Sequence, residues 1–196
     1  LTLNYLYQYD DIPVLYRTLG AGPSVTVDPA YERTHLIGGS FSNAFGELTL
    51  RGELAYKIDK RYSVNDAADT DGVVSADEAG YVLGLDWFGF DETFLSLQFF
   101  QSILTEDAAG LLRDGVESNL TFLVQRDFLN DTLVVSTIWI QSINHGDGAL
   151  RPAIKYEIWD NLEVSAGVDY FYGSNDGLFG QFGDTTRIVL GMKVGF

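Results

Sequence analysis

Alternation between apolar and small or charged residues, repeated along ten segments, is the feature that most constrains the fold of this chain. The last segment shows two interleaved sets, Ile188, Leu190, Met192, Val194 and Phe196 against Arg187, Val189, Gly191, Lys193 and Gly195. Successive side chains of a strand point to opposite faces, so this pattern predicts a strand with one apolar face. The predicted strands are residues 1–9, 35–45, 48–58, 79–88, 93–104, 118–128, 133–143, 149–159, 162–172 and 187–196.

The lengths of the strands and of their connections together indicate a membrane barrel. Most segments have the ~9–11 residues that a tilted strand needs to cross a bilayer. Short turns follow the second, fourth, sixth and eighth strands, whereas long acidic stretches follow the first, third, fifth and ninth. Outer-membrane barrels alternate in this way, with the long loops outside the cell. We therefore predict an all-β single domain over residues 1–196, a transmembrane antiparallel up-and-down β-barrel in the bacterial outer membrane, with both termini periplasmic.

The number of strands leaves closure open. Ten strands predict either a closed ten-stranded barrel or the C-terminal part of a larger barrel that further strands or chains complete. Pairing between residues 1–9 and residues 187–196 would indicate the closed form.

Composition excludes several function classes. The formal net charge of −16 argues against nucleic acid as a partner, because phosphate binding depends on clustered Lys and Arg. The absence of cysteine removes disulfides, thiolate metal sites and cysteine nucleophiles. Since no run approaches the ~18 apolar residues of a transmembrane helix, any membrane crossing must use strands.

Aromatic residues support the membrane prediction independently. Tyr and Trp favour the two membrane interfaces, and aromatic residues fall near both ends of the predicted strands. The set near the long loops is Tyr7, Tyr9, Tyr56, Tyr81, Trp139, Tyr170 and Tyr172, and the set near the turns is Phe45, Trp87, Phe88, Phe90, Phe128, Trp159 and Phe196. The alternative is a soluble β-sandwich or lipocalin-like barrel, which would place polar side chains outside and show no aromatic belts.

The C-terminal region resembles known outer-membrane proteins. The last strand resembles the signal that the barrel assembly machinery recognises, carried here by Ile188, Leu190, Met192, Val194 and Phe196. Segments 150–156, 169–173 and 176–182 resemble the closing region of a large proteobacterial outer-membrane, porin-like family known only as a domain of unknown function. The resemblance covers most of residues 31–196, and members of that family are usually much longer than this chain.

The resemblance implies transport rather than catalysis. The family is associated with envelope transport of hydrophobic compounds or lipids, and it carries no catalytic residue set to this sequence. We expect a non-enzymatic, porin-like barrel for passage or binding of small or hydrophobic molecules, with outer-membrane lipid and lipopolysaccharide as partners. The alternatives are a closed structural or adhesion barrel and, less favoured, a hydrolase at the outer rim.

The predicted inward face carries charges of both signs, which either line a pore or fill the lumen with salt bridges. If strands 149–159 and 162–172 pair about the turn at Asp160, positions summing to 320 face each other, and Arg151 meets Asp169. The candidate pore-lining residues are Arg51, Glu53, Lys57, Asp86, Arg151, Lys155, Glu157, Glu163, Asp169, Arg187 and Lys193.

The acidic loop 59–78 resembles part of a calcium loop. Asp69, Asp71 and Glu78 match positions three, five and twelve of an EF-hand, but position one is Ala67 and no helices flank the loop. An ordinary acidic loop is favoured. We expect no tightly bound cofactor, with loose Ca²⁺ or Mg²⁺ bridging to lipopolysaccharide phosphates as the metal hypothesis.

Two further loops carry functional alternatives. Residues 144–147 contain His145 between Asn and Asp, the ingredients of a rim hydrolase, although a solvated turn histidine is favoured. The glycine-rich loop Gly173–Thr186 carries Leu178, Phe179 and Phe182. This loop is either an inward-folding constriction that captures a hydrophobic solute or a hairpin packed on the rim.

Overall fold

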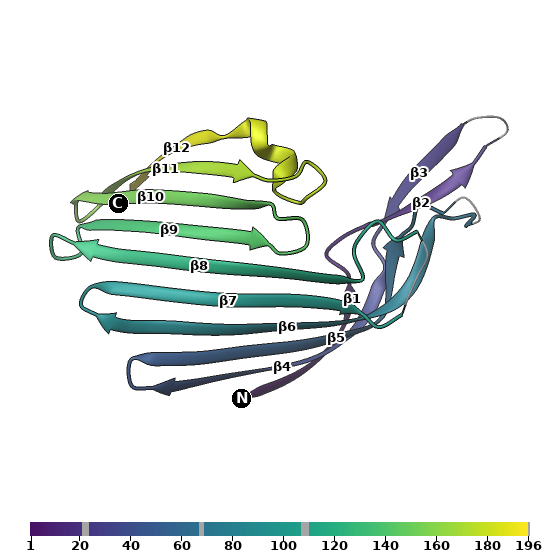
Figure 1. Ribbon diagram of the computed structural model, residues 1–196, viewed down its shortest axis with the longest axis horizontal. Coiled ribbons are helices and arrows are strands. Elements are labelled where there is room, and N and C mark those ends of the chain that lie inside the picture. Colours follow the sequence, from purple (N-terminus) through teal and green to yellow (C-terminus); the bar gives the residue numbers. More distant parts are fainter. Residues whose placement is uncertain (21–23, 67–68, 107–109, 196) are drawn as a thin grey trace. The chain divides into compact units, whose positions relative to one another are not determined.

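A computed structural model describes residues 1–20, 24–66, 69–106 and 110–195, and it is all-β apart from one short 3₁₀ helix. Ten strands form one antiparallel meander sheet in the order β1-β4-β5-β6-β7-β8-β9-β10-β11-β12 (Figure 1). Their bounds are β1 Thr2–Tyr9, β4 Arg33–Phe45, β5 Leu48–Ser63, β6 Val73–Phe90, β7 Thr93–Leu104, β8 Val116–Phe128, β9 Leu133–Ser142, β10 Gly148–Trp159, β11 Leu162–Tyr172 and β12 Arg187–Val194. The ten predicted strands and their meander order are confirmed.

Two stretches predicted as loops contain regular structure. β2 (Val14–Leu19) and β3 (Val25–Ala30) form a separate hairpin in which Val14 pairs with Ala30. β5 and β6 also extend into the predicted loop 59–78, because β5 ends only at Ser63 and β6 already begins at Val73. Charged residues in these extensions interrupt the alternation of apolar and polar residues, so the sequence pattern did not predict them as strand.

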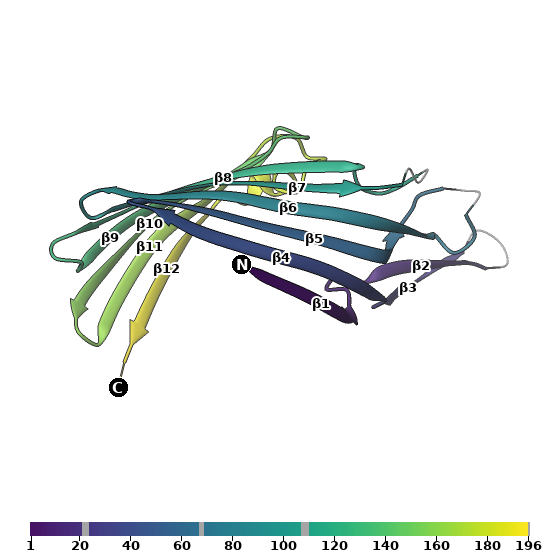
Figure 2. The same cartoon turned by 90° about the horizontal axis from the view of Figure 1, so that it is seen from below.

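The chain divides into two compact units, Leu1–Phe41, Gly52–Tyr81 and Gln101–Glu117 in the first and Ser42–Arg51, Val82–Phe100 and Ser118–Phe196 in the second. The first unit has a small apolar core of Tyr62, Ala76 and Leu104, with Val74 and Leu111 packed against it. The second unit contains β9 to β12 entirely, and β8 from Ser118 onward. Figures 1 and 2 show β10, β11 and β12 side by side.

The edges of the sheet decide the question of closure. In the part of the chain that the structure describes, β1 pairs with β4 alone and β12 pairs with β11 alone. The sheet is therefore not closed into a barrel, and the closed ten-stranded alternative is wrong for these strands by themselves. The reason is that the outer edges of β1 and β12 donate and accept no ladder hydrogen bonds between them.

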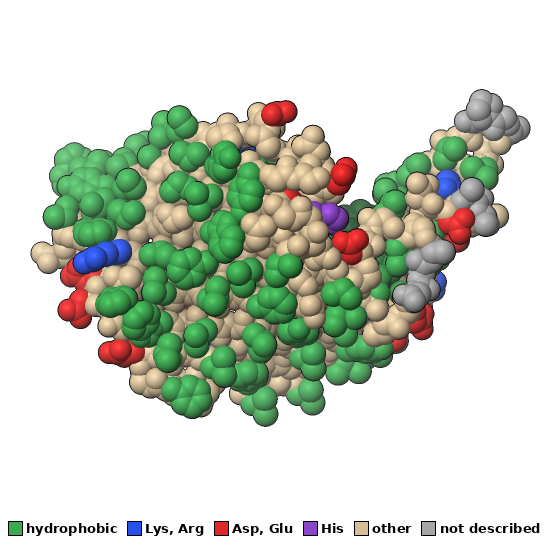
Figure 3. All heavy atoms as spheres, in the orientation of Figure 1, with side chains coloured by type: hydrophobic (Ala, Val, Ile, Leu, Met, Phe, Trp, Pro, Cys, Tyr) green, Lys and Arg blue, Asp and Glu red, His purple; other side chains and the backbone are tan. Residues whose placement is uncertain are grey.

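Burial in this sheet is inverted relative to a water-soluble fold. Buried polar side chains include Asp86, Ser96 and Asp169, whereas Leu190 is 77% exposed and Met192 is 72% exposed. Hydrophobic side chains cover the strands of the second unit on the face seen in Figure 3. Among the described residues, no helix is long and apolar enough to cross a membrane.

Candidate functional site

The register of β9 to β12 divides the second unit into a charged face and an apolar face. Ala153 pairs with Gly167 and Glu157 with Glu163, so the predicted sum of 320 is confirmed along most of the β10–β11 ladder. Cross-strand partners share a face, and neighbours along a strand do not. We call the side that bears Asp169 the charged face and the side that bears Leu190 the apolar face.

Asp169 is held between two arginines on the charged face. Its Oδ1 accepts a hydrogen bond from Arg151 Nε at 2.6 Å, and its Oδ2 accepts one from Arg187 Nε at 2.7 Å. The predicted meeting of Arg151 and Asp169 is confirmed. The Asp169 side chain is almost fully buried, whereas the Arg151 and Arg187 side chains are 51% and 66% exposed, so the cluster presents positive charge to the space in front of the sheet.

The other predicted pore-lining residues divide into paired and unpaired groups. Arg51 on β5 and Asp86 on β6 form an ion pair with a shortest distance of 2.7 Å. Glu163 pairs in register with both Glu157 and Lys193. Within the described residues, no side-chain ion pair forms at Glu53, Lys57, Lys155, Glu157, Glu163 or Lys193.

Small side chains leave a hollow in the charged face. Ser136, Ala153 and Gly167 lie in one row across β9, β10 and β11. The row on one side carries Arg151, and the row on the other carries Lys155. The resulting hollow, of about 250 Å³, is lined by these residues and by Leu123, Ile138 and Val189, among others.

The last loop is anchored by a buried carboxylate that the sequence did not reveal as an anchor. Asp147 has no exposed surface, and its Oδ2 accepts hydrogen bonds from Phe179 N at 2.6 Å and Gly180 N at 3.1 Å. The loop contains the 3₁₀ helix η1 (Gly180–Thr185), and its Phe182 ring packs against Phe171. The sequence signal for a tightly packed loop was its glycines at 173, 177 and 180. A Cβ at each of these positions would lie within 2.5 Å of another atom, so the fold of the loop needs glycine there.

The packing of Phe182 bears on the two alternatives for this loop. Phe171 is two residues from Asp169 on β11, so both side chains lie on the charged face. The contact therefore brings the loop onto the side that carries the charges, as the inward-folding alternative predicts. Leu178 and Phe182 keep large exposed surfaces.

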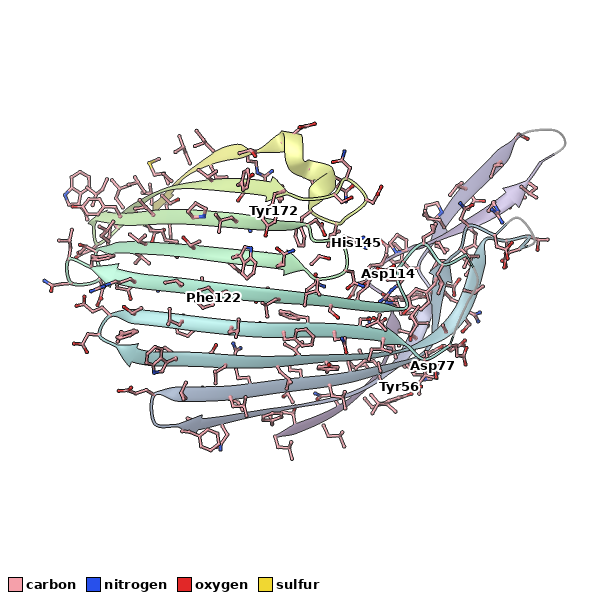
Figure 4. The ribbon with its side chains drawn as sticks, in the orientation of Figure 1. Tyr56, Asp77, Asp114, Phe122, His145 and Tyr172 are labelled. Atoms are coloured by element: carbon pink, nitrogen blue, oxygen red, sulfur yellow. The ribbon has the colours of Figure 1, made fainter. Side chains whose placement is uncertain are left out.

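The ingredients of a rim hydrolase are occupied by structural contacts. Asn144 Oδ1 accepts a hydrogen bond from Ser118 N, and the Asp147 carboxylate accepts the two loop amides. Figure 4 shows His145 and Tyr172 toward the same end of the strands. Asn144 and Asp147 thus each accept backbone hydrogen bonds that fix the loops around His145.

The three predicted metal ligands do not form one site in the described residues. Asp69 Oδ1 accepts hydrogen bonds from the backbone N of Asp71 and Gly72, which closes a turn. Glu78 lies in β6 and binds other side chains, and Ala67 falls outside the described residues. Among the described residues, no group of three His, Asp or Glu could hold a metal ion.

Glu78 instead centres a buried polar cluster in the first unit, which sequence reasoning missed. Its carboxylate accepts hydrogen bonds from Lys60 Nζ at 2.9 Å, Tyr62 Oη at 2.7 Å and Ser102 Oγ, and it is 3.3 Å from Arg113 Nη1. Lys60 also lies 3.3 Å from Asp10. Lys60 and Tyr62 are alternate residues of β5 beyond its predicted end, where charged residues interrupt the alternation, so the sequence offered little sign of the cluster.

The cluster shifts the ionisation of its members, which lie beyond the predicted membrane-crossing segments. Burial acts to raise the pKa of Glu78, but hydrogen bonds from Ser102, Tyr62 and Lys60 outweigh it and hold that pKa well below its ordinary value. Burial acts to lower the pKa of Lys60, yet its contacts with Glu78 and Asp10 raise it overall. Burial, followed by Glu78, raises the pKa of Tyr62.

The apolar face carries aromatic groups at its loop end. Trp139 Nε1 donates a hydrogen bond to Tyr172 Oη, which donates to Gln141 Oε1, both at 2.6 Å (Figure 4 labels Tyr172). Tyr170 stacks beside Tyr172. Trp139 and Tyr172 thus each combine an apolar body with a hydrogen-bonded polar tip, as interfacial aromatics do.

The predicted assembly signal lies on the exposed edge strand. Ile188, Leu190, Met192 and Val194 share the apolar face of β12, and all four are more than half exposed. Phe196, the last residue of the signal, falls outside the described residues.

Comparison with known proteins gives no assignment, because no family model and no curated protein matches this chain. The resemblance of the closing region to a porin-like family therefore stays a prediction.

Proposed function

We propose that the sheet forms part of the wall of a bacterial outer-membrane barrel, a porin-like channel for passage or binding of small or hydrophobic molecules. The inverted burial carries the proposal. Leu190 and Met192 are exposed on one face while Asp169 is buried on the other, and Asp86 on β6 is buried too. A lipid-facing apolar band around a polar interior is the arrangement of outer-membrane barrels, and exposed apolar patches of this kind are unusual in soluble monomers.

Further strands, or a further chain, complete the barrel in this proposal. The edges of β1 and β12 leave a row of backbone donors and acceptors without ladder partners in the described residues. Such groups cannot face lipid, because hydrocarbon offers them no hydrogen bond. The barrel assembly machinery, outer-membrane lipid and lipopolysaccharide are the other proposed partners, with both termini periplasmic.

Conductance and uptake test transport. We expect the purified, folded protein to produce discrete conductance steps in planar lipid bilayers and to admit small solutes into liposomes. Protein-free membranes and heat-denatured protein are the controls. A folded protein that neither conducts nor admits solutes would contradict the transport proposal.

A closed structural or adhesion barrel is the second candidate, and the ion pairs favour it. Arg51 with Asp86 and Arg151 with Asp169 are bonds that a filled lumen would contain. In that case Asp86→Ala should open a conductance that the unmodified protein lacks. Under the channel proposal the same substitution only changes an existing conductance.

A further inference from the structure

We propose that the hollow in the charged face binds a small amphipathic anion, a molecule with one carboxylate and a short apolar body. The inference deepens the proposed function, on which it rests for its biological purpose, by naming the solute class. The site lies entirely within the second unit, on β8 to β12.

The floor of the hollow is shaped by sequence. Ser136, Ala153 and Gly167 form one row, and Gln125 and Val189 continue it onto β8 and β12. Leu123, Ile138 and Arg151 stand in the row on one side and Lys155 stands in the row on the other, so the small residues between them form a depression. At ~30 Å³ per water, about 250 Å³ holds roughly eight waters, which a small organic molecule can displace.

The charge at the hollow is positive in a strongly acidic protein. Of the residues that line the hollow, Arg151 and Lys155 supply two positive charges against the single carboxylate of Asp169, a local balance of +1, and Arg187 binds Asp169 from β12. The whole chain has only 12 Lys and Arg against 28 Asp and Glu. A concentration of cations in such a chain favours an anionic ligand.

Donors remain for the ligand after the protein's own contacts are counted. In the described part of the chain, each of the two guanidiniums uses its Nε–H for Asp169, and its terminal nitrogens make no further hydrogen bond. Lys155 is exposed and forms no ion pair with any described residue. An arginine has five N–H donors in a planar fork, so both guanidiniums keep groups suited to a carboxylate.

Apolar side chains set the second half of the specificity. Leu123 and Ile138 share the row of Arg151, and Val189 lies at the far end of the floor. A fully hydrated inorganic anion gains nothing from these groups, whereas an alkyl or aryl body removes their surface from water. The combination therefore selects an organic acid over a simple ion.

Binding of three related probes tests the proposal. We expect 4-phenylbutyrate to bind the folded protein in nonionic detergent micelles with a saturable isotherm by titration calorimetry, corrected against empty micelles. Butyrate lacks the apolar body and 4-phenyl-1-butanol lacks the charge, so both should bind at least about fivefold more weakly, the equivalent of about 1 kcal/mol. Equal affinity for the acid and the alcohol would overturn the proposal.

Variants locate the site. Lys155→Gln should weaken phenylbutyrate binding by about fivefold and leave the alcohol unchanged, because it removes one partly exposed charge. Ala153→Leu should fill the hollow and abolish binding without changing the charge. Lys193→Gln is the matched control, since it removes the same charge from the same face but does not line the hollow.

Outcomes for the site and for transport can be separated. A Lys155→Gln variant that binds phenylbutyrate as tightly as Lys193→Gln does would overturn the site. Conductance without phenylbutyrate binding would overturn the inference about the hollow but would leave the channel proposal standing. Phenylbutyrate binding without conductance would support the inference about the hollow and contradict the passage of solutes through a channel.

Discussion

At the scale of single residues, Glu78 is the side chain whose replacement we expect to cost the first unit most. Glu78→Gln removes the charge that Lys60 and Arg113 approach in a mostly buried setting. Hydrogen bonds to charged groups contribute about 1.5–3 kcal/mol, so we expect a loss of roughly 2–3 kcal/mol in unfolding free energy. Urea titration of the protein folded in detergent measures it.

Glu117→Gln is the control for that substitution. Glu117 also pairs with Arg113, at 3.1 Å, but its side chain is 40% exposed. Exposed ion pairs contribute little, so its loss should stay within about 1 kcal/mol. Equal costs for the two substitutions would show that the Glu78 cluster is not a special source of stability.

Acid should weaken the same cluster. Because the pKa of Glu78 is lowered on folding, the folded state binds fewer protons at this site than the unfolded chain does. Its contribution is therefore present above the unfolded value of about 4.5 and is lost as pH falls from there toward the folded pKa. Urea midpoints between pH 6 and pH 3 should fall less steeply for Glu78→Gln than for the unmodified protein, and parallel slopes would contradict this.

The Glu78 cluster also shows where sequence reasoning stops. Its members come from β5, β6, β7 and the segment that carries Arg113, so their meeting depends on how the extended strands pair. The contact between Arg151 and Asp169 could be predicted, because the short turn between β10 and β11 fixes the register of these two strands. Local geometry was enough to predict the Arg151–Asp169 contact, whereas predicting the Glu78 cluster requires the pairing of several strands.

At the scale of elements, the last loop depends on Asp147. Asp147→Ala removes the acceptor of the Phe179 and Gly180 amides and leaves them without that partner in a buried site. We expect local opening of residues 173–186, and cleavage there by a protease in limiting amounts should rise on the order of tenfold or more. Asp176→Ala is the control, because Asp176 is an exposed carboxylate of the same loop. Equal cleavage of the two variants would rule out Asp147 as the anchor.

The loop and the edges illustrate two further limits of prediction. Alternation predicted β12 and its apolar face, and it identified the glycine-rich loop without choosing between a constriction and a rim hairpin. The contacts that fold the loop, Asp147 with Phe179 and Phe171 with Phe182, join residues from different strands and loops. Closure is equally non-local, because it depends on the number and stagger of strands rather than on any one of them.

At the scale of the whole molecule, the two faces of β12 distinguish a membrane protein from a soluble one. Leu190 and Val189 are neighbours in the middle of the strand, both exposed, and they point to opposite faces. If the apolar face meets lipid, Leu190→Lys should cost roughly 2–4 kcal/mol, as charges do at the bilayer midplane, while Val189→Lys faces the polar side and should cost about 1 kcal/mol or less. In a soluble fold the two substitutions are alike, because exposed positions change stability by only about 0.5 kcal/mol. Urea unfolding of both variants from phospholipid vesicles measures the difference, and equal costs would remove the main support for a lipid-facing wall.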